Sequence, residues 1–165
     1  MPNTIKEIQK DGRLFFFSCE NGNNDLVKVI LNLTREVNIT DKAGVTPLMV
    51  ACKGSHFNVV ETLLVSNADV TQCANDKCSP LVYACTAGNV DIVNILLGHG
   101  AFINLANKSG ITPLHAACMN EHEQVIKALI EKGADVNVVD VLGETPRSNH
   151  DSKETRNSND IVQLR

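Results

Sequence analysis

The chain has 165 residues, of which 43% are hydrophobic and 21% are charged, and this balance is typical of a folded protein rather than a disordered or collagen-like one. The formal net charge of −4 gives no general attraction to nucleic acid or to anionic membranes. The apolar runs, such as residues 14–17, are far shorter than the roughly 18 residues of a membrane-spanning helix, and the amino terminus lacks a secretory signal pattern. We therefore expect a protein that is neither secreted nor embedded in a membrane.

The sequence repeats itself at an interval of 33 residues. The tripeptide Thr-Pro-Leu at 46–48 recurs as Ser-Pro-Leu at 79–81 and as Thr-Pro-Leu at 112–114, and Thr-Pro at 145–146 begins a further copy. Alanine keeps the same interval at 51, 84 and 117, and cysteine keeps it at 19, 52, 85 and 118. The agreement of several columns indicates a stack of similar units.

The first unit predicts two helices. Residues 12–22 resemble the first helix of a unit, with Arg13-Leu14 where later copies have Thr-Pro, and residues 24–31 have the apolar spacing of a second helix. The outer face of a stack meets water and needs a polar cap. We expect residues 1–40 to form an amino-terminal capping unit.

The following units each predict a helix pair. A hydroxyl side chain followed by proline is a favoured helix start, because the hydroxyl caps a backbone N–H and proline at the first position loses no needed donor. Apolar residues at i, i+1, i+4 and i+5, as at 59, 60, 63 and 64, then indicate an amphipathic second helix. Gly100, Gly133 and Asn67 suit the left-handed end of that helix, whereas Thr34 at the matching position predicts a less regular end.

Turn residues connect one unit to the next. Asp41, Asn107 and Asp140 each precede a glycine by three residues, which predicts projecting, hairpin-like loops. Lys77 replaces that glycine in one loop, where a left-handed backbone would cost about 1 kcal/mol. Either this loop has a different shape, which a partner could use, or the strain is tolerated.

A 33-residue period with T-P-L-x-x-A, a helix pair and G-A-D-V-N before D-x-x-G resembles the ankyrin repeat, over residues 11–146 without insertion or deletion. The resemblance implies an all-α solenoid of stacked helix-turn-helix units joined by β-hairpin-like loops. Beyond the capping unit, we expect units at 41–73, 74–106 and 107–139. Residues 140–165 are expected to form a degenerate carboxy-terminal capping unit or a partly disordered tail, and these two alternatives stay open.

Cysteine and histidine do not point to catalysis or metal binding. Four cysteines occupy one buried column, about 10 Å apart in a stack, which is too far for a disulfide and indicates a reducing compartment. Cys73 and Cys78 bracket a loop and are predicted to be incidental thiols, with a redox or metal role or a contact to a partner as the alternatives. Hydrogen bonding within the loop explains His56 and His122. No catalytic motif, metal ligand set or cofactor site is predicted.

The resemblance implies a binding protein that uses its loop tips and the exposed ends of its first helices. Apolar positions such as Val45 and Ile111, with no predicted role in the core, favour a protein partner. Carried onto this sequence, the expected partner-binding residues are Lys42, Ala43, Val45, Lys53, Asn75, Asp76, Cys78, Thr86, Lys108, Ser109, Ile111, Met119, Asn120, Val141, Leu142 and Glu144.

We expect a monomeric adaptor or inhibitor in the cytoplasm or nucleus that performs no chemistry. The alternative is an ankyrin module that binds nucleic acid or a small ligand, which would need a basic groove lined with aromatic residues.

The resemblance also implies a candidate modification. Some ankyrin repeats are substrates of an asparaginyl hydroxylase that favours a leucine eight residues before the asparagine, and Leu129 with Asp135-Val136-Asn137 fits that pattern.

Overall fold

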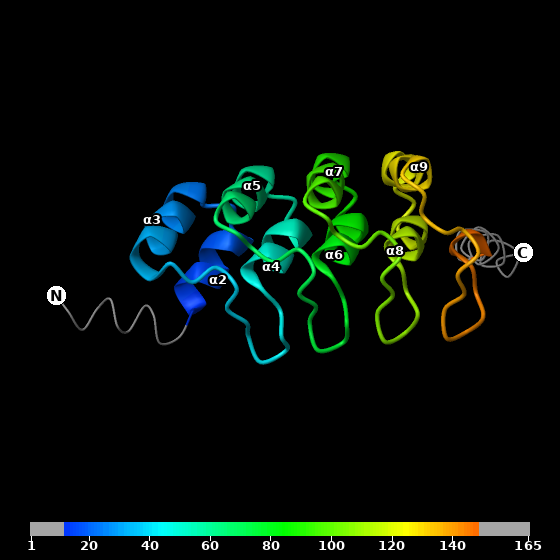
Figure 1. Cartoon of the computed structure of the whole chain (residues 1–165), viewed down its shortest axis with the longest axis horizontal. Coiled ribbons are helices and arrows are strands. Elements are labelled where there is room, and N and C mark those ends of the chain that lie inside the picture. Colours follow the sequence, from blue (N-terminus) through cyan, green and yellow to red (C-terminus); the bar gives the residue numbers. More distant parts are fainter. Residues whose placement is uncertain (1–11, 149–165) are drawn as a thin grey trace, which may run out of the picture.

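The computed structural model describes residues 12–148, which form a single row of helix pairs (Figure 1). The helices are α2 (Arg13–Glu20), α3 (Asn24–Thr34), α4 (Pro47–Lys53), α5 (Phe57–Val65), α6 (Pro80–Ala87), α7 (Val90–Gly98), α8 (Pro113–Met119) and α9 (Glu123–Glu131). Residues 12–148 contain no strand, so the prediction of an all-α repeat fold is confirmed. The two alternatives for the carboxy-terminal end concern residues that lie mostly outside the described part of the chain.

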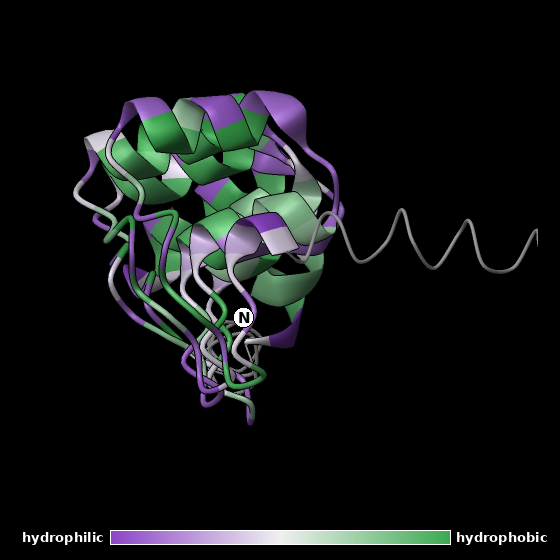
Figure 2. Ribbon diagram, turned by 90° about the vertical axis from the view of Figure 1, so that its right-hand side faces the viewer, coloured by the Kyte–Doolittle hydropathy of each residue, from purple (hydrophilic) through white to green (hydrophobic). Residues whose placement is uncertain are grey.

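The helices form two layers with the loops on one side. The first helices of the pairs, α2, α4, α6 and α8, pack on one another in chain order, and the second helices, α3, α5, α7 and α9, do the same. In Figure 1 the loops project beyond the first helices, away from the second helices. Figure 2 shows hydrophobic residues on the sides of the helices that face the other layer and hydrophilic residues on the outer side of the second helices.

The first helices begin where the hydroxyl-proline pairs predict. The side chains of Thr46, Ser79 and Thr112 each accept a hydrogen bond from the backbone N–H three residues later, at 3.3 Å. A proline follows each of them at the first helical position. Residues 146–148 are again helical, and the Thr145 N–H donates to Ser148 Oγ at 2.8 Å, so the fourth hydroxyl-proline pair also begins a helix.

The apolar columns of the second helices fill the space between the layers. Ile30, Leu63, Leu96 and Leu129 are at most 3% exposed. The predicted left-handed helix ends are present at Asn67, Gly100 and Gly133. The irregular end predicted at Thr34 is also found, because α3 continues through Thr34 and the left-handed residue is Arg35, with φ of 56°.

The loop that carries Lys77 has the same shape as the others. In all four loops the residue three positions after the start donates its backbone N–H to the first carbonyl, at 2.8 Å for Lys77 and 3.0–3.1 Å for Gly44, Gly110 and Gly143. Lys77 adopts a φ of 65°, in the left-handed region that disfavours side chains. Of the two alternatives, the strain is therefore tolerated and the loop is not reshaped.

We expect the variant Lys77→Gly to be more stable than the wild type by about 0.5–1 kcal/mol, because relief of the left-handed strain exceeds the added entropy of the unfolded chain. Denaturant unfolding of both proteins measures this difference. Lys108→Gly, in a neighbouring loop at a position without positive φ, is the control and is expected to gain nothing. An equal gain in both variants would contradict the explanation.

Gly110 is needed where two loops approach each other closely. Its φ is 78°, and a Cβ placed there would lie 2.7 Å from the Cα of Asp140. Gly133 has a similar φ of 87° but nothing within 4 Å of the same position. We expect Gly133→Ala to cost about 1 kcal/mol through strain alone and Gly110→Ala to cost about 1–3 kcal/mol more through overpacking. Denaturant unfolding of both variants measures the difference. Equal losses of unfolding free energy would contradict the prediction, because the two loops would then move apart at no cost in free energy.

Candidate interaction surface

Backbone hydrogen bonds join the loop tips, residues 41–45, 74–78, 107–111 and 140–144, into a continuous row. The N–H of Asn75 donates to the Ala43 carbonyl at 2.8 Å, and the N–H of Lys108 donates to Asp76 at 2.9 Å. The N–H of Val141 donates to the Ser109 carbonyl at 3.1 Å, so donors and acceptors both follow the 33-residue interval. Because each tip is held by its neighbour, their side chains are presented in a fixed order, which reduces the entropy lost on binding.

Side chains within the tips add to this order. Asp41 Oδ1 accepts hydrogen bonds from the N–H groups of Ala43 and Val45 at 2.8 and 2.9 Å, and Asn107 and Asp140 make the equivalent pairs. Ala74 cannot make them, and in that tip Asp76 accepts from the Cys78 N–H instead. The Asn75 side chain donates to the Lys42 carbonyl at 3.1 Å, which adds a second bond between two tips.

The predicted partner-binding residues all lie on the loop tips or on the carboxy-terminal ends of first helices, and we call the first helices together with the loop tips the inner surface. Twelve of them are exposed: Lys42, Ala43, Lys53, Asn75, Asp76, Thr86, Lys108, Ser109, Met119, Asn120, Val141 and Leu142. Four are half-buried: Val45, Cys78, Ile111 and Glu144. Ile111 packs against the hydrophobic core, so the expectation that it has no core role is wrong.

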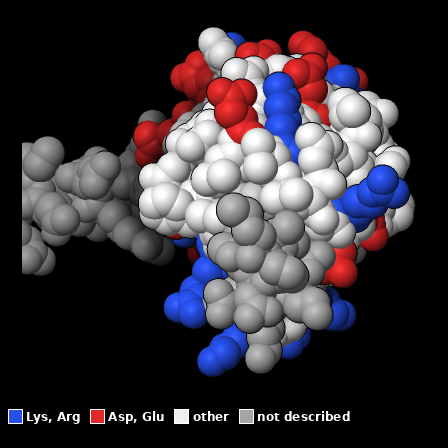
Figure 3. All heavy atoms as spheres, turned by 90° about the vertical axis from the view of Figure 1, so that its left-hand side faces the viewer, with Lys and Arg blue, Asp and Glu red and all other residues white. Residues whose placement is uncertain are grey.

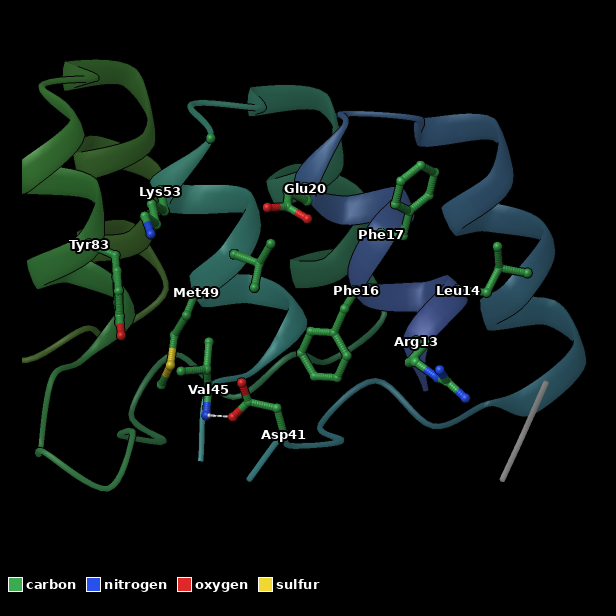
Figure 4. Close-up of a pocket in the computed structure, with 12 residues that line it drawn as sticks. Arg13, Leu14, Phe16, Phe17, Glu20, Asp41, Val45, Met49, Lys53 and Tyr83 are labelled. Atoms are coloured by element: carbon green, nitrogen blue, oxygen red, sulfur yellow. Dashed lines mark hydrogen bonds between the residues drawn. The ribbon is translucent and has the colours of Figure 1, made fainter. Parts of the chain in front are cut away.

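A groove of about 1060 Å³ lies on the inner surface at the amino-terminal end of the stack (Figure 4). Leu14, Phe16 and Phe17 from α2 form one side, and Val45, Met49, Val50 and Lys53 form the other, with Tyr83 of α6 at its edge. Phe17 is 60% exposed and Leu14 is 38% exposed. Glu20, Asp41 and Arg13 also line it, so an apolar groove is bordered by charges of both signs.

Of this groove, sequence reasoning selected only Val45 and Lys53 and missed the contribution of α2. The available signal was the run Leu14-Phe15-Phe16-Phe17, since a short helix with one buried face cannot bury four successive large apolar residues. Phe15 turns into the core at 3% exposure, and this leaves Leu14 and Phe17 in contact with solvent. The aromatic residues of the inner surface are therefore concentrated on the capping unit and Tyr83.

Burial raises the pKa of the Tyr83 hydroxyl above its ordinary value, and the nearby Asp76, Cys78 and Asp41 raise it further. The hydroxyl therefore stays protonated at neutral pH and can donate a hydrogen bond at the edge of the groove.

The histidines are structural. His115 is fully buried, and its Nδ1 accepts from the Thr112 N–H at 3.2 Å, so Nε2 carries the proton and donates to the Glu144 carbonyl at 3.1 Å. His56 and His122 donate from Nε2 to the carbonyls of Glu20 and Thr86 in the preceding unit, at 2.7 and 3.0 Å. The explanation by bonding within their own loop is wrong, because these two side chains connect neighbouring units.

The cysteine column lies in the core as predicted. Cys19, Cys52, Cys85 and Cys118 are at most 6% exposed. Burial raises the pKa of the Cys19 thiol to about 12, and it raises the pKa of the other three thiols as well. These groups remain neutral at physiological pH, which suits a small core residue and not a nucleophile.

Cys73 and Cys78 are half-buried, and both thiols are free. Partial burial and the carboxylate of Asp76 raise the pKa of both, and the Asn107 side-chain amide donates to Cys78 Sγ at 3.3 Å. A raised pKa disfavours the reactive thiolate. A redox role for this pair stays a prediction.

Asn137 is exposed on the turn that follows α9. At the equivalent positions, Asn38 and Asn104 accept hydrogen bonds from the N–H groups of Asp69 and Asp135 in the next unit, at 2.9 Å each. Within the described residues the side chain of Asn137 makes no such bond, although its N–H donates to Asp135 Oδ1. Hydroxylation of Asn137 stays a prediction.

Residues 12–148 contain no group of three His, Cys, Asp or Glu side chains that could hold a metal ion. No helix within the same residues has the length and hydrophobicity needed to cross a membrane.

Comparison with known proteins agrees with this architecture. A family model for ankyrin repeats in three copies matches residues 6–72 and 62–140. A stretch of 69 residues is 32% identical to the tyrosine-protein kinase HTK16 of Hydra vulgaris. That alignment covers 33% of this chain and only 9% of the kinase. The similarity therefore concerns a small part of a much longer protein.

Proposed function

Because the chain belongs to the ankyrin-repeat family, whose repeats are generally protein-interaction modules, we propose that it is an adaptor or inhibitor that binds another protein through its inner surface. The family is typically non-catalytic, and the proposed mechanism is occlusion or scaffolding of the partner. The similarity to HTK16 covers too little of that kinase to support a kinase activity here.

One observation carries the proposal: the inner surface combines fixed loop tips with exposed apolar side chains. Val141 and Leu142 are 69% and 78% exposed on a tip that hydrogen bonds hold in place, and Met119, at the carboxy-terminal end of α8, is 39% exposed. Rigid presentation of apolar groups among polar ones is the composition of a protein interface. The second helices and their turns also expose apolar residues, such as Val29, Leu33 and Val65, but these lie outside the groove and the row of tips.

The test compares two variants, each of which replaces two exposed apolar residues with glutamate. In Met119→Glu/Leu142→Glu the changes lie on the inner surface, whereas in Val29→Glu/Val65→Glu they lie on the second helices, and all four positions are exposed. Wild type and both variants are used to capture proteins from an extract of cells that express the chain. We expect one protein to be retained by the wild type and by the second-helix variant and to be lost from the inner-surface variant.

Circular dichroism and thermal unfolding of the three proteins check that they fold equally. Loss of the captured protein from the second-helix variant alone would contradict the proposal. Equal retention by all three proteins would also contradict it.

The nucleic-acid alternative gains one supporting observation, since Phe16, Phe17 and Tyr83 lie in one groove with Lys53. The carboxylates of Glu20 and Asp41 line the same groove and would repel a phosphate backbone. We therefore keep the protein partner as the proposed function.

A further inference from the structure

The carboxy-terminal end of the stack leaves two apolar positions uncovered that earlier units bury. Val60 in α5 is fully buried, whereas Ile126, two repeats further along, is half-buried. Leu64 is 5% exposed, and its counterpart Ile130 is 49% exposed. The second helices pack on one another in chain order, and no second helix within residues 12–148 follows α9 (Figure 1). The two isoleucines therefore mark the face of α9 that a further second helix would cover.

A fifth unit begins in register beside this face. The N–H of Val141 donates to the Ser109 carbonyl, and Nε2 of His115 donates to the Glu144 carbonyl at 3.1 Å. Residues 146–148 are helical, and in Figure 1 this helical turn lies beyond α8, at the end of the row of first helices. The start of the fifth unit therefore packs on the fourth as earlier units pack on one another.

Within residues 149–165, one stretch has the sequence pattern of a second helix. Residues 158–164 are Ser-Asn-Asp-Ile-Val-Gln-Leu, and residues 89–95, which begin α7, are Asn-Val-Asp-Ile-Val-Asn-Ile. Ser158 takes the place of Asn89, whose side chain caps α7, and serine is equally favoured as a cap. The stretch therefore repeats the second-helix pattern, two 33-residue intervals and three residues after α7.

The first unit identifies the columns through which a second helix contacts the unit before it, because no unit precedes it within the described residues. In α3, Leu26 is half-buried and Val29 is 52% exposed. At the same two columns of α7, Ile92 is fully buried and Ile95 is half-buried. Residues three apart lie on one face of a helix. These two columns therefore form the face that packs against the preceding second helix.

Ile161 and Leu164 occupy these two columns when the stretch is aligned with α7. We propose that residues 158–165 form the second helix of the fifth unit and pack on α9, with Ile161 and Leu164 against Ile126 and Ile130. Removal of these apolar side chains from water favours the contact, and attachment to the fifth first helix keeps the segment at a high local concentration. The proposal goes beyond the proposed function, because it assigns this end of the stack to the chain itself and not to a partner.

A second copy of the chain is the competing occupant of this face. Figure 3 shows the opposite end of the stack, where uncharged residues cover much of the surface and charged side chains lie toward its edge. Leu14, Val29 and Leu33, in the helices α2 and α3 of that end, are 38%, 52% and 46% exposed, so two copies could stack end to end. The segment of the same chain is favoured, because its sequence matches the columns of a second helix and its binding does not depend on protein concentration.

Methyl NMR spectroscopy of the full chain tests the contact directly. In a sample labelled at the methyl groups of isoleucine, leucine and valine, we expect nuclear Overhauser effects that join Ile126 or Ile130 to Ile161 or Leu164. A second sample mixes labelled with unlabelled copies, so that isotope filtering selects contacts between two molecules. Absence of these effects from the first sample would overturn the proposal. Their presence in the filtered spectrum would overturn it in favour of a second copy.

Two variants measure what the contact contributes, and one is the matched control for the other. Ile161→Asp/Leu164→Asp places two carboxylates on the proposed contact face, whereas Asn159→Asp/Gln163→Asp places two at columns that are exposed in α9. We expect the first variant to lower Tm by about 4 °C or more and to speed amide exchange in α9 about tenfold, and the control to leave both unchanged. Wild-type values in the first variant, or equal losses in both variants, would overturn the proposal.

Discussion

Replacement of Leu96 by alanine is expected to lower the free energy of unfolding by about 2–5 kcal/mol. Leu96 lies in α7, in the middle of the stack, and is fully buried between the two layers of helices. Its removal exchanges close packing for a cavity that neighbouring units on both sides would have to fill. Chemical denaturation followed by circular dichroism measures the loss.

Leu142→Ala is the matched control for this prediction, because it removes the same atoms from a side chain that is 78% exposed on a loop tip. We expect a change within about 0.5 kcal/mol for it. Similar losses in both variants would mean that the 33-residue apolar column does not form the core described here.

Raising the pH from 8 to 10 is expected to destabilise the protein through its buried thiols. In the unfolded chain a thiol ionises above its ordinary pKa of 9.0, whereas burial raises the pKa of Cys52 and Cys85 in the folded state. Above pH 9 the unfolded chain loses protons that the folded chain keeps, so stability falls as the pH rises. Each of these two thiols contributes a loss of about 1.4 kcal/mol over this interval, or about 3 kcal/mol together.

The variant Cys52→Ala/Cys85→Ala isolates this contribution from that of other groups that titrate at high pH. Wild type and variant are unfolded by denaturant at pH 8 and at pH 10 under reducing conditions. We expect the wild type to lose about 3 kcal/mol more than the variant between the two pH values. Identical losses would contradict burial of these thiols in the neutral form.

Most of the fold could be predicted because each 33-residue unit repeats the same pattern of capping residues and apolar positions. Thr46, Ser79 and Thr112 cap helices at the predicted positions, and the apolar columns at 63 and 96 are buried. Even the irregular end at Thr34 was visible as a departure from the pattern. In every unit, local helix propensity and packing favour the same helices. This agreement allows the fold of a repeat protein to be predicted from its sequence.

The candidate site was less predictable, because its distinguishing residues are departures from the repeat. Phe17 falls in the column of Val50 and Tyr83, which are half-buried, so the repeat pattern does not mark it as exposed, and the role of Phe16 and Phe17 depends on how α2 packs against α4. Ile111 looked free from its position in the loop, yet it packs on the core. The partners of His56 and His122 belong to a preceding unit, 36 residues earlier, so spacing within one unit could not reveal them.

Amide hydrogen exchange of the chain, alone and with its captured partner bound, tests the central claim most directly. If the inner surface binds the partner, exchange will slow in peptides from the loop tips and the first helices, within 13–20, 41–54, 74–87, 107–120 and 140–144. Exchange in α3, α5, α7 and α9 will stay as it is in the free protein. Protection confined to these second helices, with the loop tips unchanged, would contradict the account.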